Sequence, residues 1–112
     1  MKDRYSRQTL FYYIGQKGQE KLSKSRVALI GCGGLGSIIA NSLVRAGVGF
    51  IRIVDKDRLE ASNLQRQMLY DEKDIESMLP KAKIAGEKLK AVNSEVTIEA
   101  LADEANEKIL WK

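Results

Sequence analysis

The sequence predicts an α/β fold with a Rossmann-like, mostly parallel sheet, of which this 112-residue chain forms the N-terminal portion. Two observations support this prediction. A short apolar run, residues 27–30, is followed at once by a glycine-rich turn, residues 31–36, and then by a helical pattern. A second apolar run follows and ends at Asp55. Strand, glycine turn, helix and strand in this order form a right-handed crossover between parallel strands.

The first 26 residues are predicted to form an N-terminal arm, and residues 27–112 a partial Rossmann-like domain. Charged and aromatic residues mix as far as residue 16, and residues 16–24 are expected to form a short helix anchored by Leu22. Residues 27–30 are expected to form a buried strand, because the run is apolar, partly β-branched and directly followed by glycine.

Residues 34–46 are predicted to form a helix that stops at Gly47, as helices commonly do at glycine. Residues spaced three and four apart are expected to form its apolar face: Leu35, Ile38, Ile39, Leu43 and Ala46. Residues 50–54 are the next predicted strand, and this strand leads directly to Asp55.

The second half of the chain continues the alternation. Residues 56–79 are polar and irregular, with one short helix expected near residues 74–78. Pro80 favours the start of a helix that extends to about Val92, because proline is tolerated at the first helical position. Residues 96–101 are a third strand candidate, and residues 106–112 begin another helix. This is the first half of a doubly wound sheet, so the chain is expected to end within a domain.

Composition excludes several kinds of function. The chain has no histidine and one cysteine, which excludes a histidine base and an internal disulfide and leaves no expected metal site. The 19 basic and 15 acidic residues are scattered, which does not favour a nucleic-acid partner. No apolar run is long enough to cross a membrane, and the N-terminus lacks the apolar core of a signal peptide. A cytoplasmic protein is therefore expected.

The turn at residues 31–36 fits the Gly-x-Gly-x-x-Gly pattern of nucleotide-binding folds, after a strand and before a helix. Gly31 allows the tight turn, Gly33 lets a phosphate approach the backbone, and Gly36 lets the helix pack against the strand. Gly34 stands where the helix is expected to begin, and its N-terminus offers free N–H groups and a partial positive charge to a phosphate. The alternative is a turn with a purely structural role.

Two acidic residues follow the second strand. Asp55 stands where a carboxylate can accept hydrogen bonds from ribose hydroxyls. Asp57 is assigned to the same site, although the alternative of a solvated turn residue is stronger for Asp57 than for Asp55. Cys32, inside the glycine turn, is better explained as a small residue in a tight turn than as a reactive thiol.

Arg66 and Lys81 discriminate most between kinds of nucleotide chemistry. A dehydrogenase needs no cations beyond its pyrophosphate loop. A triphosphate attacked at its α-phosphorus needs cations that neutralise the charge building on the leaving pyrophosphate. Arg66 can bind phosphate bidentately, and Lys81 supplies a point charge. Asn63 and Gln67 can add neutral donors, whereas each cation taken alone can equally be a solvated surface residue.

Five segments occur in a fixed order along the chain: RYSRQ at residues 4–8, GCGGLGS at 31–37, AGVG at 46–49, VDKD at 54–57 and NLQRQ at 63–67. Together they resemble the ThiF/MoeB/HesA family, the bacterial branch of the ubiquitin-activating-enzyme superfamily. The resemblance implies an ATP-dependent adenylyltransferase. Such enzymes activate the C-terminal Gly-Gly carboxylate of a ubiquitin-like sulfur-carrier protein, in thiamine or molybdopterin pathways, and give an acyl-adenylate and pyrophosphate.

The same resemblance implies residue roles. The glycine turn, Asn63, Arg66 and Lys81 would contact the phosphates of ATP, and Asp55 would hold the ribose. Arg7 would reach across a homodimer interface to the partner's ATP. The aspartate that helps to hold Mg²⁺, the sulfur-transfer cysteine and the cysteine pairs of a zinc site belong to later parts of the family's sequence. The full-length protein is therefore expected to be an enzyme, and this chain alone to be inactive.

The chain departs from the family pattern near Lys81. The family's Gly-x-Pro-Lys is replaced by Met78-Leu79-Pro80-Lys81, after a slightly longer loop. Three alternatives stay open: a fragment of an NAD-dependent oxidoreductase, a tRNA-modifying member of the same family, and a non-catalytic nucleotide-binding fragment. The oxidoreductase leaves four residues unexplained: Arg7, Asn63, Arg66 and Lys81.

Overall fold

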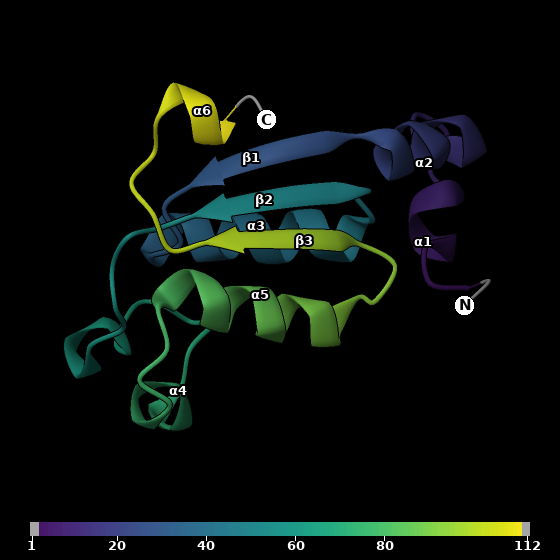
Figure 1. Cartoon of the computed structure of the whole chain (residues 1–112). Helices are drawn as coiled ribbons and strands as arrows, with labels where there is room; N and C mark the ends of the chain where they lie inside the picture. Colours follow the sequence, from purple (N-terminus) through teal and green to yellow (C-terminus); the bar gives the residue numbers. More distant parts are fainter. Residues whose placement is uncertain (1–2, 111–112) are drawn as a thin grey trace.

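The computed structural model describes residues 3–110, with every side chain in that range except that of Leu110. Helices and strands follow one another (Figure 1) in this order: α1 (Ser6–Thr9), α2 (Gly15–Lys24), β1 (Arg26–Ile30), α3 (Gly34–Ala46), β2 (Phe50–Val54), the 3-10 turn η1 (Ala61–Asn63), α4 (Glu72–Glu76), α5 (Lys81–Val92), β3 (Thr97–Leu101) and α6 (Glu107–Leu110). Each expected strand and helix is present, and the last two residues of the predicted helix 106–112 lie outside the described range. None of the described helices has the length and apolarity needed to cross a membrane.

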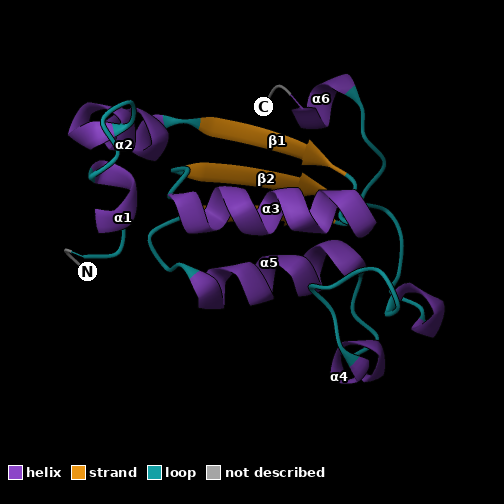
Figure 2. Ribbon diagram, turned by 180° about the vertical axis from the view of Figure 1, so that it is seen from behind, coloured by secondary structure: helices purple, strands orange, loops and turns teal. Residues whose placement is uncertain are grey.

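The three strands form a parallel sheet in the order β1-β2-β3. Helices α3 and α5 cover the same face of this sheet (Figure 2). Because both crossovers return the chain to parallel strands, the loops after β1, β2 and β3 all leave the same edge of the sheet. That edge, at the carboxyl ends of the strands, is where ligands bind in open α/β sheets.

The core lies between the sheet and its two helices. Ile51 and Ile53 of β2 are fully buried, as are Ala40 of α3 and Ala85 and Leu89 of α5. Burying a large aliphatic side chain stabilises a fold by about 1.5–3 kcal/mol. The predicted α/β architecture with a parallel sheet is thus confirmed, and its centre is the strand β2.

Helix α3 faces the sheet with a different side from the one that its apolar pattern predicted. Its exposed side carries Leu35, Ile38 and Ile39, which are 73%, 48% and 38% exposed, and its buried side carries Ser37, Ala40 and Val44. The helix starts very close to the glycine turn, since a Cβ on Gly36 would lie 2.2 Å from the carbonyl oxygen of Gly31. At this end of the helix the close approach leaves room only for small residues, whereas Leu43 and Val44 pack on the core further along.

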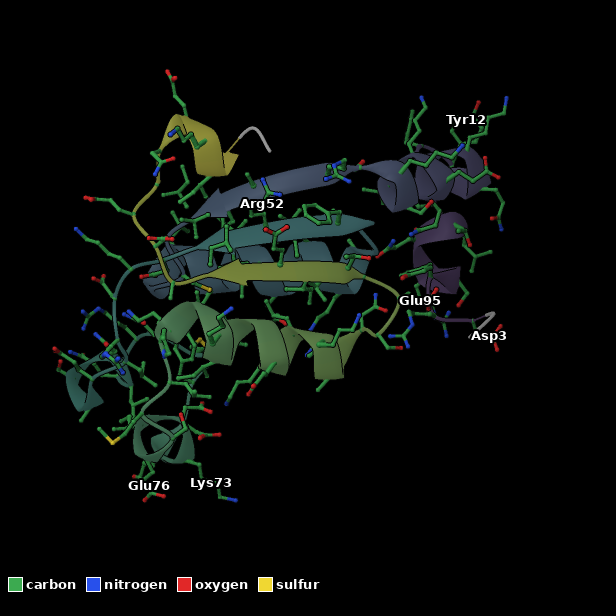
Figure 3. All side chains as sticks on the ribbon, viewed as in Figure 1. Asp3, Tyr12, Arg52, Lys73, Glu76 and Glu95 are labelled. Atoms are coloured by element: carbon green, nitrogen blue, oxygen red, sulfur yellow. The ribbon has the colours of Figure 1, made fainter. Side chains whose placement is uncertain are left out.

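Strand β1 is an edge strand rather than the buried strand that was expected. Ala28 is exposed, and Ile30 is 59% exposed. Among the described residues only β2 pairs with β1, and the face that carries Ala28 and Ile30 is turned away from α3 and α5. On that face Arg52 forms an ion pair with Glu99 of β3 at 3.0 Å (Figure 3). Arg52 also donates to the carbonyl oxygen of Ile109 in α6 at 2.7 Å, and this hydrogen bond holds α6 against the sheet.

The N-terminal arm packs at the other end of the sheet, beside the last turns of α3 and α5 (Figure 1). The side-chain amides of Gln8 and Gln19 both donate to the carbonyl oxygen of Ala46, each at 3.0 Å. Asn93, just after α5, donates to the hydroxyl oxygen of Tyr5 at 2.9 Å. These hydrogen bonds provide donors for the last carbonyl group of α3, and they hold the arm on the domain.

Candidate functional site

The glycine turn presents the N-terminus of α3 at the carboxyl edge of the sheet. Gly31 has a φ of 86°, in the left-handed region that glycine adopts without strain. The first hydrogen bond of α3 runs from the N–H of Ser37 to the carbonyl oxygen of Gly33 at 3.0 Å, and no side chain caps the helix. The N–H groups of the first turn, which includes Gly34 and Gly36, therefore have no intrahelical acceptor. Such an end binds anions.

Asp55 ties the glycine turn to the loop that follows β2. The residue is 8% exposed. Its Oδ2 accepts the N–H of Cys32 at 2.7 Å, and its Oδ1 accepts the N–H of Asp57 at 2.8 Å. Each carboxylate oxygen can accept more than one hydrogen bond, so the carboxylate can still accept from a ligand hydroxyl.

Lys81 is the first residue of α5 and is only 4% exposed. Its backbone N–H donates to the carbonyl oxygen of Asp57 at 3.1 Å. Within residues 3–110, its ammonium group has no hydrogen bond and no ion pair. A hollow of about 280 Å³ lies beside it, lined also by Asp57, Arg58, Glu60 and Asn63. Arg58 donates to Met78, so Lys81 is the cation of this hollow that is left to bind an anion, beside the carboxylates of Asp57 and Glu60.

Gln67 is a second buried polar side chain without a partner. It is 4% exposed, and its Oε1 accepts no hydrogen bond from the described residues. Its amide packs on the glycine turn, since a Cβ on Gly33 would lie 3.4 Å from its Nε2. Arg66, by contrast, is exposed and donates to the carbonyl oxygen of Ser62 at 3.1 Å. The structure thus places Gln67 inside the site and Arg66 on the surface of the same loop.

A second hollow, of about 380 Å³, lies where the three strands end. Ile30 and Val54 give it an apolar side, and Gly31, Asp55 and Asp57 also line it. Asp57 belongs to both hollows, so they adjoin at this residue. The larger hollow thus combines an apolar side with several carboxylates, and the smaller one combines two cations with two carboxylates.

Arg7 is the one predicted site residue that the structure places far from the others. It is exposed on α1, next to Gln8, which binds the last residue of α3. The glycine turn lies at the opposite end of α3, about 20 Å away for a helix of this length. Arg7 therefore does not take part in the site of its own chain, and its action on a partner's site stays a prediction.

Tyr70 is a site residue that the sequence reasoning missed. It is 6% exposed, and its hydroxyl donates to the carbonyl oxygen of Cys32 at 2.6 Å. Burial raises the pKa of Tyr70, so the hydroxyl keeps its proton. Burial also raises the pKa of the Cys32 thiol, which favours the neutral, unreactive form. The available signal was an aromatic residue within an otherwise polar stretch shortly after Gln67.

Met78, which stands where the family pattern has glycine, has a backbone conformation that is unusual for a residue with a side chain. Met78 has a φ of 59°, in the left-handed region that glycine adopts far more readily. Its carbonyl oxygen accepts from Nη1 of Arg58 at 2.6 Å, and its side chain is 78% exposed. Arg58 thus holds a strained residue in the loop that leads to Lys81.

A parallel sheet, an uncapped helix N-terminus, a buried carboxylate and a lysine that has no partner among residues 3–110 are features typical of nucleotide-binding α/β proteins. The chain belongs to the ThiF family, whose family model matches residues 5–111. It is 50% identical over 101 residues to the sulfur carrier protein ThiS adenylyltransferase of Bacillus subtilis, covering 90% of this chain and 30% of that protein. The chain thus spans about a third of the length of this curated relative.

Comparison with solved structures supports the same fold. The E. coli MccB structure with ATP superposes with a TM-score of 0.82 at 34% identity, covering 93% of this chain and 31% of that one. The E. coli tRNA N6-threonylcarbamoyladenosine dehydratase TcdA in complex with AMP superposes with a TM-score of 0.84 at 26% identity, covering 93% of this chain and 41% of that one. Both neighbours were solved with an adenine nucleotide.

Proposed function

We propose that the full-length protein is an ATP-dependent adenylyltransferase that activates the C-terminal Gly-Gly carboxylate of a ubiquitin-like sulfur-carrier protein. The observation that carries this proposal is Lys81, a residue only 4% exposed, whose side chain lines a hollow beside Asp57 and has no counter-ion in the described part of the chain. A triphosphate supplies that counter-ion. The 50% identity to an enzyme named for this activity supports the same substrate class.

In the proposed complex, the glycine turn and the N-terminus of α3 bind phosphate oxygens, and Asp55 accepts a ribose hydroxyl. Asn63, Gln67 and Lys81 contact the phosphates from the other side. Arg66 swings from its contact with Ser62 to the same phosphates. An exposed arginine that holds one carbonyl oxygen can make this change at little cost.

The reaction needs charge stabilisation more than proton transfer. A carboxylate oxygen of the carrier attacks the α-phosphorus, and the bond from that phosphorus to the bridging oxygen of pyrophosphate breaks. Arg66 and Lys81 neutralise the negative charge that builds on the pyrophosphate. The attacking carboxylate is already ionised at neutral pH, so the absence of histidine from the sequence is no obstacle.

Magnesium would supply further charge neutralisation on the phosphates. No three His, Cys, Asp or Glu side chains within residues 3–110 gather in a way that could hold a metal ion. From the family resemblance, we propose that the main magnesium aspartate and any cysteines of a zinc site lie outside these 112 residues. We also propose that the protein acts in the cytoplasm, where ATP is present.

The proposed enzyme is a homodimer in which Arg7 reaches the partner's ATP. Subunit mixing tests this arrangement. Arg7→Ala and Lys81→Ala full-length variants are each expected to be inactive, but a mixture contains heterodimers with one intact site. Random mixing should restore about a quarter of wild-type activity, because half of the dimers then carry one working site of two. No restored activity after verified subunit exchange would show that Arg7 does not act across the interface.

ATP–pyrophosphate exchange tests the activity itself. The full-length protein should exchange labelled pyrophosphate into ATP when given a carrier protein that ends in Gly-Gly, and not when the terminal glycine is deleted. Turnover by residues 1–112 alone would contradict the proposal that this part is inactive. Calorimetric titration that showed NAD binding and no ATP binding would favour the oxidoreductase instead.

The second candidate is a tRNA-modifying enzyme, which is favoured by the superposition on the E. coli dehydratase. Absence of exchange with every Gly-Gly carrier, together with ATP hydrolysis stimulated by tRNA, would select it. Both candidates use the same ATP site.

A further inference from the structure

Tyr70 joins two parts of the site that are far apart in the sequence. Its hydroxyl donates to the carbonyl oxygen of Cys32 at 2.6 Å, across a buried contact. Its own N–H donates to the carbonyl oxygen of Gln67 at 3.3 Å, so Tyr70 and Gln67 belong to one turn. The loop that carries Arg66 and Gln67 is therefore fastened directly to the glycine turn.

The Cys32 peptide groups are held from both sides. Asp55 accepts the N–H of Cys32 at 2.7 Å, while Tyr70 donates to its carbonyl oxygen at 2.6 Å. In a trans peptide the C=O and the next N–H point in opposite directions. Holding the carbonyl of Cys32 therefore also sets the direction of the N–H of Gly33, the residue that caps α3.

A glycine-rich turn needs such a restraint. Three of the four residues from Gly31 to Gly34 lack a side chain, and glycine has the largest backbone freedom of any residue. A binding site whose N–H groups are already aimed at the ligand loses less entropy on binding than a flexible one. A buried hydroxyl that fixes one of these peptides thus acts on ligand affinity as well as on stability.

We propose that Tyr70 is a positioning residue of the nucleotide site: through the Cys32 carbonyl it orients the glycine turn and sets its distance from the loop of Arg66 and Gln67. This inference rests on the proposed ATP site and names a residue that controls it. Tyr70 itself does not touch the nucleotide. Its effect passes through the backbone of Cys32 and Gly33 and through the placement of Gln67, whose amide packs on Gly33.

The test is Tyr70→Phe in the full-length protein, with Tyr5→Phe as the matched control. Both changes remove one hydroxyl oxygen from a hydrogen bond, at opposite ends of the sheet. We expect similar losses of thermal stability. Only Tyr70→Phe should weaken ATP binding, by at least fivefold in Kd by calorimetry, and raise the KM for ATP more than it lowers kcat. Only Tyr70→Phe should speed hydrogen exchange at the amides of Cys32 and Gly33.

The outcomes separate the two proposals. Unchanged ATP affinity in Tyr70→Phe, with normal binding by the wild type, would overturn the positioning role and leave the proposed function intact. Failure of the wild type to bind ATP would overturn the proposed function, and amide exchange would still decide whether Tyr70 holds the turn. If Tyr70→Phe does not fold, wild-type exchange decides. The amides of Cys32 and Asp57 both donate to the Asp55 carboxylate, but only Cys32 is also held by Tyr70. Slower exchange at Cys32 than at Asp57 before nucleotide is added supports the role, and equal or faster exchange at Cys32 refutes it.

Discussion

Buried polar side chains have hydrogen-bond partners at one end of the parallel sheet and lack them at the other, among the described residues. At the amino end, Gln19 and Asn93 are 8% and 1% exposed, and at the carboxyl end Gln67 and Lys81 are both 4% exposed. Gln19 donates to Ala46, and Asn93 donates to both Tyr5 and the carbonyl oxygen of Val44. No side-chain hydrogen bond to Gln67 or Lys81 occurs within the described residues.

Burial is thus nearly the same at the two ends, and the difference lies in the partners. Almost all buried polar groups in folded proteins are hydrogen-bonded, so the exceptions mark places where something else binds. At the amino end, the hydrogen bonds of Gln19 and Asn93 join the N-terminal arm to α3 and α5. The carboxyl end is open, and in the proposed complex the nucleotide supplies the partners of its polar groups. Changes at the two ends should therefore separate stability from nucleotide binding.

The largest effect is expected from Asp55→Ala, at the carboxyl end. Asp55 accepts two backbone N–H groups, and a hydrogen bond to a charged acceptor contributes about 1.5–3 kcal/mol. Unfolding in urea should show a loss of about 3 kcal/mol or more, and calorimetry should show no ATP binding. Asp57→Ala, at an exposed position, should change stability by less than about 0.5 kcal/mol. Equal losses in both variants would mean that Asp55 does not hold the turn.

At the amino end, Asn93→Ala should lower stability by about 2 kcal/mol, because its amide makes three buried or half-buried hydrogen bonds. The Kd for ATP should not change, since the joint lies at the far end of α3. Ser94→Ala, next to it and exposed, is the control and should have little effect. A marked rise in Kd for the Asn93 variant would contradict the separation between the two ends.

Lys81→Met should act in opposite directions on stability and on binding. Without nucleotide, replacing an unpaired buried ammonium with an apolar side chain of similar length should raise the unfolding free energy by about 1 kcal/mol. ATP binding should weaken at least tenfold. Thermal unfolding with and without ATP measures both, and Lys17→Met on exposed α2 is the control. A loss of stability without ATP would show that Lys81 already has a partner in the folded chain.

The smallest effect is expected at the loop before Lys81. Met78→Gly should stabilise the protein by about 0.5–1 kcal/mol, because glycine adopts a φ of 59° without strain. Met68, as exposed as Met78 but without a positive φ, is the matched site. Met68→Gly should bring no gain. Denaturant midpoints measured side by side check this prediction, and a gain at both positions would exclude strain as the cause.

The sequence predicted local structure well where the signals are local. Residues 34–46 and 50–54 were predicted with the ends that α3 and β2 have, because glycine ends the helix and apolar residues run without interruption through the strand. The motifs and the resemblance assigned the glycine turn, Asp55 and Lys81 to one nucleotide site, and the structure places all three at the carboxyl ends of the strands or next to them. The sequence did not reveal which side of α3 is buried, because a close approach of backbone to backbone at Gly36 selects small residues there.

The class of fold and the family could be predicted from the sequence, since they depend on periodicity, glycine placement and ordered motifs. Which polar groups have partners became clear from the packing of distant segments. Asp55 binds the glycine turn, Tyr70 donates to Cys32, and Lys81 is buried with no counter-ion among residues 3–110. These facts depend on contacts between segments that are 23 to 38 residues apart, and no local pattern encodes such distances.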